Sequence, residues 1–217
     1  MRSKTIEDYK HKLKLTRVQR DILVGLMLGD GHLETQNKGK TYRLKIEYAV
    51  AKSDYCNHIY ESFQEWVLTP PKPRSKNSRS HLSENIAFST LSHGAFRFYA
   101  QQFYQEGRKV VPPMISKLLT PRGLAYWFMD DGSMKSKQSK GVILNTQGFS
   151  RREVNALAEL LEIKFQLFAS ERKQKDGYQI YISGKSYESF IATVGDLIHP
   201  SMKYKLPEAR RTQLPKK

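Results

Sequence analysis

The chain has 217 residues, and 39% of them are hydrophobic, so it can bury one large core or two cores of roughly 100 residues each. Its 37 Lys and Arg residues outnumber its 21 Asp and Glu residues and give a formal net charge of +16. This excess predicts a polyanionic partner, with nucleic acid favoured over an anionic membrane, and a merely basic surface is the plainer alternative. Every apolar stretch is shorter than the ~20 residues that cross a bilayer, so no membrane-spanning helix is expected.

Cys56 is the only cysteine, which excludes an intramolecular disulfide and a cysteine cluster for zinc. We therefore expect an intracellular, reducing compartment. Residues 1–20 carry many charges and lack the apolar region of a secretory signal, and Glu7 and Asp8 disfavour a basic mitochondrial leader. The sequence leaves a mitochondrion, another organelle and a bacterial cytoplasm as alternatives.

The chain opens with a predicted helix and hairpin. Thr16 and Gln19 form a capping box, and the helix that they start runs to Gly29. Residues 31–51 predict a hairpin that turns near residues 37–40. Apolar and charged residues alternate along its second strand, so that one face is apolar and the other charged: Tyr42, Leu44, Ile46 and Tyr48 against Arg43, Lys45 and Glu47.

A helix, a loop, a strand and a helix are expected to complete the first half. Residues 53–67 predict a helix with Ser53 as its cap, and one of its faces is apolar through Ile59, Phe63 and Trp66. Residues 69–80 are rich in proline and basic residues and predict a loop. A strand near residues 85–90 and a helix over residues 95–105 follow.

The second half repeats this order. Thr120 and Pro121 start a helix that ends at Gly132, and residues 133–147 predict a hairpin. A helix with the capping box Ser150 and Glu153, a hairpin turning at Asp176-Gly177 and a helix over residues 187–198 follow, and Pro200 stops the last one. Matching features recur about 100 residues apart, which is too long for a solenoid and indicates a duplicated domain pair related by a pseudo-twofold axis.

An acid follows the predicted central helix of each half. Residues 22–28 are apolar on every side, which indicates burial at the centre of the molecule, and Gly25 and Gly29 would let the matching helix approach closely. If the two helices run in the same direction, Asp30 and Asp131 become neighbours, where the helix dipoles and mutual repulsion disfavour both carboxylates. A divalent cation relieves both effects, so we predict a Mg²⁺ site. The simpler alternative is an exposed Asp-Gly helix end with a left-handed glycine.

Two lysines also recur, each just before a proline and after the last helix or turn of its half. They are Lys109 in GRKVVPPM and Lys205 in MKYKLPEA. A lysine near a scissile phosphate stabilises developing charge or orients the attacking water. Chance placement on a solvated surface is the alternative.

The runs LVGLMLGDG and LAYWFMDDG resemble the two signature helices of the LAGLIDADG homing endonucleases, in the single-chain form that carries both motifs. GKTYRLKIEY, WVLTPP, LTPRGLAYWFMDDGSM, VILNTQGFS and YKLP extend the likeness over about residues 20–207, and they are similar to the branch that includes the mitochondrial omega-intron endonuclease. Some positions depart from the usual motifs: Leu28 replaces a common acid, and Tyr126 and Trp127 replace Gly and Leu. Together with the acid at Asp130, the bulk of Tyr126 argues against a symmetric approach of the helices.

The resemblance implies an α+β fold of two pseudo-twofold-related αββαββα halves. The halves would be residues 1–118, with an N-terminal extension over residues 1–15, and residues 119–217. Saddle-shaped antiparallel sheets would bind double-stranded DNA with a long specific site, and the signature helices would form a central two-helix interface. The protein would act as a monomer.

The resemblance also implies the site residues and the reaction. By motif register, the last acid before the glycine is the metal ligand, which is Asp30 in the first motif and Asp131, rather than Asp130, in the second. The carbonyls of Gly29 and Asp130 are implied as further ligands, and basic residues that flank the active centres are matched by Lys109 and Lys205. The implied cofactor is Mg²⁺, with Mn²⁺ as a substitute and Ca²⁺ binding without supporting cleavage. The implied reaction hydrolyses one phosphodiester per strand and leaves staggered 3′ overhangs.

Polar side chains on the sheets are the expected DNA contacts. We assign base reading in the major groove to Arg43, Lys45 and Glu47. We assign phosphate contacts to Lys72, Arg74, Lys76, Arg79, Lys135, Lys137, Lys140, Arg172 and Lys173, with solvated hairpin tips as the alternative. Asn145 and Gln147 suit either adenine recognition or turn chemistry.

The leading interpretation is a site-specific DNA endonuclease. The alternatives are an RNA maturase that binds host intron RNA on the same scaffold and a DNA-binding regulator that does not cleave. Retention of both acids favours cleavage. The target sequence cannot be read from the chain, because side-chain choice and DNA deformability together define it.

Overall fold

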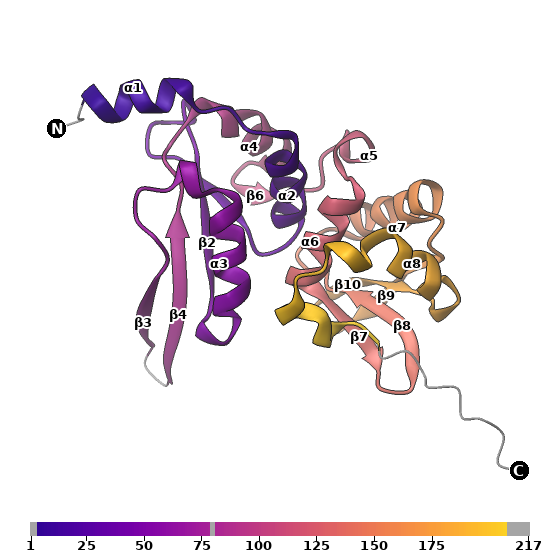
Figure 1. Cartoon of the computed structure of the whole chain (residues 1–217). Coiled ribbons are helices and arrows are strands. Elements are labelled where there is room, and N and C mark those ends of the chain that lie inside the picture. The colour runs from indigo at the N-terminus through magenta and orange to yellow at the C-terminus, as the bar shows by residue number, and fades with distance from the viewer. Residues whose placement is uncertain (1–3, 79–80, 208–217) are drawn as a thin grey trace, which may run out of the picture.

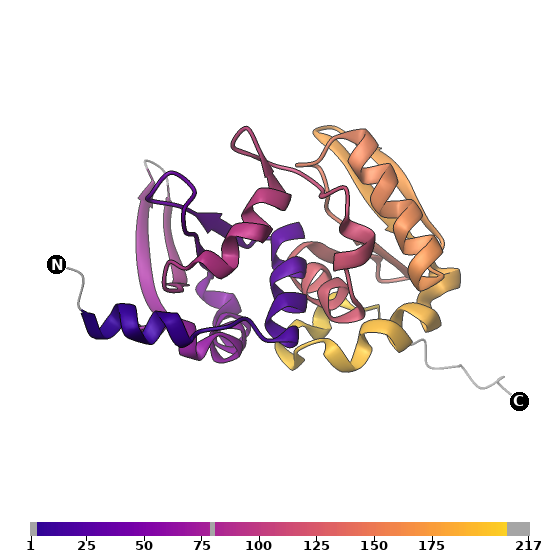
Figure 2. The same cartoon turned by 90° about the horizontal axis from the view of Figure 1, so that it is seen from above.

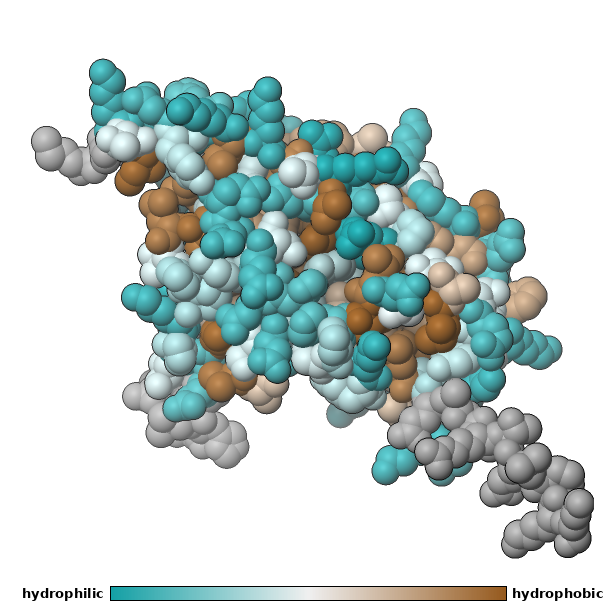
Figure 3. Space-filling model, viewed as in Figure 1, coloured by the Kyte–Doolittle hydropathy of each residue, from teal (hydrophilic) through white to brown (hydrophobic). Residues whose placement is uncertain are grey.

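The computed structural model describes residues 4–78 and 81–207, and it shows two α+β halves side by side (Figure 1). Each half contains a helix, a hairpin, a second helix, a second hairpin and a third helix, as the family resemblance implies. Within the described ranges, no helix is long and apolar enough to cross a membrane. On the face drawn in Figure 3, hydrophilic residues predominate along the top edge, where α1 lies.

The first half begins with an additional helix and ends with a short hairpin and a short helix. Its elements are α1 (Lys4–Lys12), α2 (Arg17–Leu28), β1 (His32–Glu34), β2 (Arg43–Ala49), α3 (Ser53–Ser62), β3 (Lys72–Ser78), β4 (His81–Ser89), α4 (Arg97–Phe103), β5 (Tyr104–Gln105), β6 (Arg108–Lys109) and α5 (Ile115–Leu118). The predicted capping box starts α2, because the Thr16 hydroxyl accepts from Gln19 N and the Gln19 side chain accepts from Thr16 N.

The second half repeats the core of the first. Its elements are α6 (Pro121–Asp131), β7 (Gly132–Ser136), β8 (Ser139–Leu144), α7 (Arg151–Phe165), β9 (Ala169–Gln174), β10 (Gly177–Ile182), α8 (Tyr187–Val194) and a 3₁₀ helix over Pro200–Lys205. Thr120 caps α6 with Pro121 as its first residue, and the capping box of Ser150 and Glu153 starts α7. These helix starts are therefore confirmed.

Each half contains a four-stranded antiparallel sheet with the same strand order. The orders are β1-β2-β4-β3 and β7-β8-β10-β9. On β2 the alternation predicted from the sequence is present: Leu44, Ile46 and Tyr48 are buried, whereas Arg43, Lys45 and Glu47 are partly exposed. We call the face that carries these charged residues, and its counterpart in the second half, the outer face of the sheet. The other face packs on the helices.

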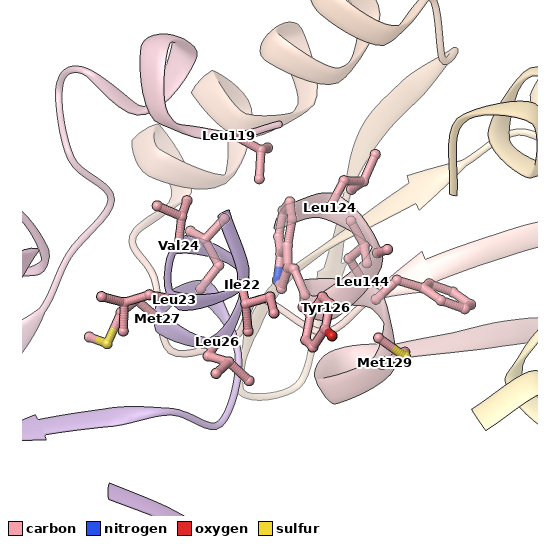
Figure 4. Close-up of a cluster of buried hydrophobic side chains, with 14 of the residues drawn as sticks. Ile22, Leu23, Val24, Leu26, Met27, Leu119, Leu124, Tyr126, Met129 and Leu144 are labelled. Atoms are coloured by element: carbon pink, nitrogen blue, oxygen red, sulfur yellow. The ribbon is translucent and has the colours of Figure 1, made fainter. Parts of the chain in front are cut away.

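Helices α2 and α6 lie side by side at the centre, with one sheet to either side (Figures 1 and 2). Nearly every residue of their contact is buried, and Figure 4 shows Leu23, Leu26 and Tyr126 within this core. A Cβ atom at Gly25 would lie 2.3 Å from Gly123 O, so glycine is required for this approach. The prediction of a close glycine-mediated helix pair is confirmed.

Three local predictions are wrong. Residues 72–78 form strand β3 instead of a loop, because they pair with β4. β3 lies at the edge of the sheet, where a proline such as Pro73 is tolerated although it has no N–H to donate. Ser53 is not the cap of α3, since a 3₁₀ turn over Val50–Lys52 leads into the helix and Lys52 occupies the cap position. The β9–β10 turn consists of residues 175–176, one residue earlier than predicted, because Gly177 already pairs with Gln174.

Candidate active site

The acids Asp30 and Asp131 lie at the C-terminal ends of the two central helices. Helix α6 continues through Asp131, whereas α2 ends at Leu28, two residues before Asp30. The glycines that follow the two acids are not left-handed, since Gly132 has φ −78° and Gly31 is not among the described glycines with positive φ. The simple left-handed Asp-Gly helix end is therefore not what the chain forms.

The electrostatics of the site show that its carboxylates are close together. Burial, Asp30 and Asp130 raise the pKa of Asp131 to about 7. Burial and then Asp30 raise the pKa of Asp130 to about 7 as well. Asp30 is more exposed, and its Oδ2 lies 3.8 Å from Lys52 Nζ. The three acids thus form one cluster in which the negative charge of Asp30 disfavours ionisation of both Asp130 and Asp131.

Asp130 is buried, with an exposed fraction of 5%, and it contacts the first half through hydrogen bonds. Its Oδ2 accepts from Asp30 N at 2.9 Å. Its Oδ1 accepts from Tyr48 Oη at 2.7 Å and from Tyr55 Oη at 3.1 Å. The side chain of Asp130 therefore points into the first half, as expected for a helix pair that is not symmetric.

Each of the two recurring lysines bonds the carbonyl that directly precedes the acid of its half, together with one neighbouring carbonyl. Lys109 Nζ donates to Gly29 O at 2.7 Å and to Gly31 O at 2.8 Å. Lys205 Nζ donates to Met129 O at 2.6 Å and to Asp130 O at 2.7 Å. Each ammonium thus binds carbonyls at the end of its own signature helix, where unpaired oxygens carry partial negative charge.

Burial affects both lysines. It lowers the pKa of Lys109, and burial together with Lys52 lowers the pKa of Lys205 to about 8. The carbonyls of Gly29 and Asp130, which the family resemblance implies as metal ligands, are the ones that accept these lysine hydrogen bonds. A carbonyl oxygen has two lone pairs, so each bond occupies one of them.

The donor set fits a hard divalent cation that is shared with DNA. Within residues 4–78 and 81–207, no group of three His, Cys, Asp or Glu side chains is arranged to hold a metal ion by itself. Mg²⁺ is commonly bound by only one or two carboxylates, with substrate phosphate and water completing its ligands. Asp30 and Asp131 supply such a pair, and a cation would offset the burial and the acid–acid repulsion that raise the pKa of Asp131.

Most of the first-half residues predicted to contact DNA lie on the outer face. The strand register places Lys45 and Lys72 on either side of β4, opposite Ser89 and Ala87. A hollow of about 510 Å³ is lined on this face by Arg43, Lys45, Lys72 and Arg74. Glu47 faces the same way and accepts from Asn85 Nδ2 at 2.8 Å. The side chain of Lys76 and the whole of Arg79 lie outside the described residues.

The second-half residues are divided between the two faces. The Arg172 guanidinium lies 3.6 Å from the centroid of the Tyr181 ring, and Lys135 Nζ lies 5.2 Å from it, so both are on the outer face. Lys137 is exposed in the β7–β8 turn. Lys140 instead bonds Glu188 of α8 at 2.9 Å, and Lys173 pairs with Tyr178, whose ring contacts Arg151 of α7. Lys140 and Lys173 therefore belong to the helix side and not to the outer face.

Asn145 and Gln147 are placed in turn structure. Asn145 Nδ2 donates to Asp131 O at 2.8 Å, and the backbone N–H of Asn145 donates to the same oxygen at 3.0 Å. Gln147 packs against Gly177 of the β9–β10 hairpin. Asn145 thus holds the end of the second signature helix, which favours turn chemistry over base reading for this residue.

Sequence reasoning missed Lys52, Tyr48 and Tyr55. Lys52 ends the 3₁₀ turn that follows β2 and lies against Asp30 and the Tyr48 ring. Tyr48 was predicted as part of the apolar face, and its ring is indeed buried while its hydroxyl reaches Asp130. A polar hydroxyl at the end of a buried strand was the available signal, because a buried tyrosine hydroxyl needs a partner.

Residues 20–190 match the model of the LAGLIDADG DNA endonuclease family. The chain belongs to this family. Its signature helices are α2 and α6, and its candidate active centre is the acid cluster at their ends.

Relatives of this LAGLIDADG protein include endonucleases and maturases. It is 36% identical over 213 residues to the probable intron-encoded endonuclease 1 of Wickerhamomyces canadensis, covering 94% of this chain and 90% of that protein. It is 30% identical over 201 residues to the cytochrome b mRNA maturase bI2 of Debaryomyces hansenii, covering 86% of this chain and 72% of that protein.

A solved structure shares the whole architecture. The homing endonuclease I-WcaI bound to its DNA recognition sequence superimposes with a TM-score of 0.90 at 34% sequence identity, covering 95% of this chain and 94% of that chain. The predicted α+β fold and the predicted membership of the LAGLIDADG endonucleases are therefore confirmed.

Proposed function

We propose that the protein is a monomeric, site-specific homing endonuclease that cuts both strands of DNA and leaves staggered 3′ overhangs. The observation that carries the proposal is the meeting of Asp30 and Asp131, one from each half, at the ends of α2 and α6. With one acid from each half, the site can serve two scissile phosphates, one on each DNA strand. We also propose the division of the chain at residues 118 and 119, between α5 and α6, and the closer kinship to the mitochondrial omega-intron endonuclease.

In this mechanism, Asp30 and Asp131 would hold the divalent metal, with Mg²⁺ as the expected ion, Mn²⁺ as a substitute and Ca²⁺ as an ion that supports binding only. The chemistry supplied there would be polarisation of the scissile phosphate and a lowered pKa of water. Lys109 and Lys205 keep positive charge beside each acid and hold the helix ends in place through their paired carbonyl bonds.

The outer faces of the two sheets supply DNA binding in this proposal. Arg43 and Lys45 have the length and donors to reach base edges in the major groove. The phosphate contacts are assigned to Lys72, Arg74, Lys135, Lys137 and Arg172. The DNA-bound relative at 34% identity and a TM-score of 0.90 supports DNA binding by this chain.

The decisive experiment is cleavage of the cognate site by single-acid variants. Selection of cleaved sequences from a randomised duplex library in Mg²⁺, with a Ca²⁺ control, identifies the site. Asp30→Asn and Asp131→Asn are each expected to abolish cutting of at least one strand while DNA affinity in Ca²⁺ is retained. Undiminished cutting of both strands by both variants would remove the metal assignment.

A second function, RNA maturation, is favoured by a specific relative. The maturase bI2 of Debaryomyces hansenii is 30% identical over most of this chain. We infer that host intron RNA is a candidate second partner. Splicing of the host intron in vitro, with and without the protein, tests this role, and an unchanged splicing rate would exclude it. A regulator that does not cleave is disfavoured because both acids are retained.

A further inference from the structure

We propose that Asp130 is a positioning residue that fixes the backbone of Asp30 for DNA cleavage, a role that rests on the proposed function. The carboxylate of Asp130 comes from the second half and accepts the Asp30 N–H at 2.9 Å. Its other oxygen accepts from the hydroxyls of Tyr48 and Tyr55. All three donors belong to the first half, so one buried side chain connects the active centre of that half to the other half.

Asp30 needs such an acceptor because it lies beyond the end of its helix. At the end of α2, Gly29 N bonds Gly25 O, and Gly31 N bonds Leu26 O at 2.8 Å. These bonds leave the Asp30 N–H outside the helical pattern, and it bonds Asp130 instead. Asp131 differs because α6 continues through it.

Gly29 makes the room for Asp130. A Cβ atom at Gly29 would lie 2.5 Å from both Cβ and Oδ2 of Asp130. Gly29 and Asp130 each directly precede the acid of their half, so they are equivalent positions. Gly29 in the first half and Asp130 in the second therefore fit together. Two acids at these positions would collide, and two glycines would leave the Asp30 N–H without this acceptor.

The chemistry of the pocket calls for a carboxylate. Two hydroxyls and one backbone N–H donate to Asp130, and an ionised carboxylate accepts without donating. In an Asp130→Asn variant, the amide oxygen can still accept from the tyrosines. Its NH₂ group then faces the Asp30 N–H, so two donors meet and the bond to Asp30 is lost.

This arrangement supports the two acids unequally. Asp30 is held by a side chain of the other half, whereas Gly29 has no side chain with which to hold Asp131. Loss of the Asp130 carboxylate therefore affects the strand whose cutting depends on Asp30 more than the other strand. That strand is identified by the product that the Asp30→Asn variant fails to make.

The test is the Asp130→Asn variant, assayed by NMR of the Asp30 amide and by strand-resolved cleavage. We expect the amide proton of Asp30 to move upfield and to exchange faster with solvent. We also expect the Asp30-dependent strand to be cut about 10- to 100-fold more slowly, with the other strand less affected and DNA affinity in Ca²⁺ within twofold of wild type. Nicked DNA should accumulate.

Glu153→Gln is the matched control. Glu153 is also an acid of the second half that accepts a first-half N–H, that of Val111 at 2.7 Å, but it lies at the start of α7. This variant should lose stability without changing the Asp30 amide or the strand preference. If Asp130→Asn does not fold, Tyr48→Phe, which removes one donor to Asp130, should slow the same strand to a smaller degree.

An unchanged Asp30 amide in Asp130→Asn, or an equal loss on both strands that Glu153→Gln reproduces, would overturn the proposal. The amide measurement needs no DNA, so it decides the positioning role independently of cleavage. Failure of the wild-type protein to cut any selected duplex would instead overturn the endonuclease proposal.

Discussion

Asp131 is a carboxyl group that must lose a proton before it can hold a cation. Burial and the neighbouring Asp30 and Asp130 raise its pKa to about 7, which is close to neutral pH. Because the charge of Asp130 acts on Asp131, the titrations of these two acids are coupled. Metal binding and proton binding therefore compete in the pH range where the enzyme is expected to work.

We predict that the Mg²⁺ concentration for half-maximal cleavage rises as the pH falls below about 7, by up to about tenfold per pH unit. The folding stability of the metal-free protein depends on pH in the opposite direction. Because the pKa of Asp131 is higher in the folded than in the unfolded chain, Asp131 stabilises the fold at low pH, and this contribution is lost as the pH rises from about 4 to about 7. Thermal denaturation should therefore show a stabilisation by Mg²⁺ over EDTA that grows as the pH rises through 7. In Asp131→Asn, the stabilisation by Mg²⁺ should increase much less with pH. An increase equal to that of the wild type would refute the assignment of Asp131 as a metal ligand.

The central elements are specified by sequence features that act locally. The cap of α2, the cap of α6 and the apolar surface of both helices could be predicted because a helix start and an all-apolar helix each have a short-range physical cause. Strand β3 could not, since KPRSKNS has no apolar alternation and gains its structure from pairing with β4. The contact of Asp130 with Tyr48 and Tyr55 was also out of reach, because it joins separate elements of the two halves.

One misplacement could have been avoided. Lys140, Val142 and Leu144 alternate along β8, and residues two apart on a strand share a face. The burial of Val142 and Leu144 therefore places Lys140 on the helix side, where it bonds Glu188. Charge alone had assigned it to phosphate binding.

We predict that Gly25→Ala destabilises the protein by about 1–3 kcal/mol or more, because a Cβ there would lie 2.3 Å from Gly123 O and force α2 and α6 apart. Urea unfolding monitored by circular dichroism measures this free energy. Gly148→Ala is the control, since a Cβ at Gly148 meets nothing within 4 Å. Equal stability of the two variants would show that the helix contact tolerates a methyl group.

A second prediction concerns the two faces of the sheets. Lys45→Ala removes an outer-face lysine and should change the preference at particular base pairs, by about 1–3 kcal/mol at a contacted position. Lys173→Ala removes a lysine of similar charge from the helix side and should leave specificity unchanged. Cleavage of a library of single-base variants of the cognate site compares them. Similar specificity changes in both would mean that the outer face does not read the DNA.

Across the whole molecule, the two halves also meet at a pair of histidines away from the acids. The rings of His58 in α3 and His199 lie 4.5 Å apart, and His58 Nε2 is 2.8 Å from Tyr126 Oη. Burial, His199 and Arg122 lower the pKa of His58. Protonation of His58 therefore opposes the contact between the halves.

We predict that the stability contributed by neutral His58 is lost as the pH falls below about 6.5, the unfolded-state value for histidine. A lowered folded-state pKa means that the unfolded chain binds the proton first, so the stability is present above that pH and lost below it. His58→Gln keeps a side chain that can bond Tyr126 but removes the titration. Its melting temperature should fall less between pH 7 and pH 5, and an identical fall would assign the effect to other groups.

The pairing of Gly29 with Asp130 has a consequence for how this chain could have arisen and how it can be rebuilt. A dimer of two second halves would place one Asp130 against another and bury two negative charges in the contact between the central helices. Two copies of the first half would leave the hydroxyls of Tyr48 and Tyr55 enclosed with no acceptor. A homodimer of either half can therefore not replace the two-half chain, and any exchange of halves with a relative must carry the matching residue across.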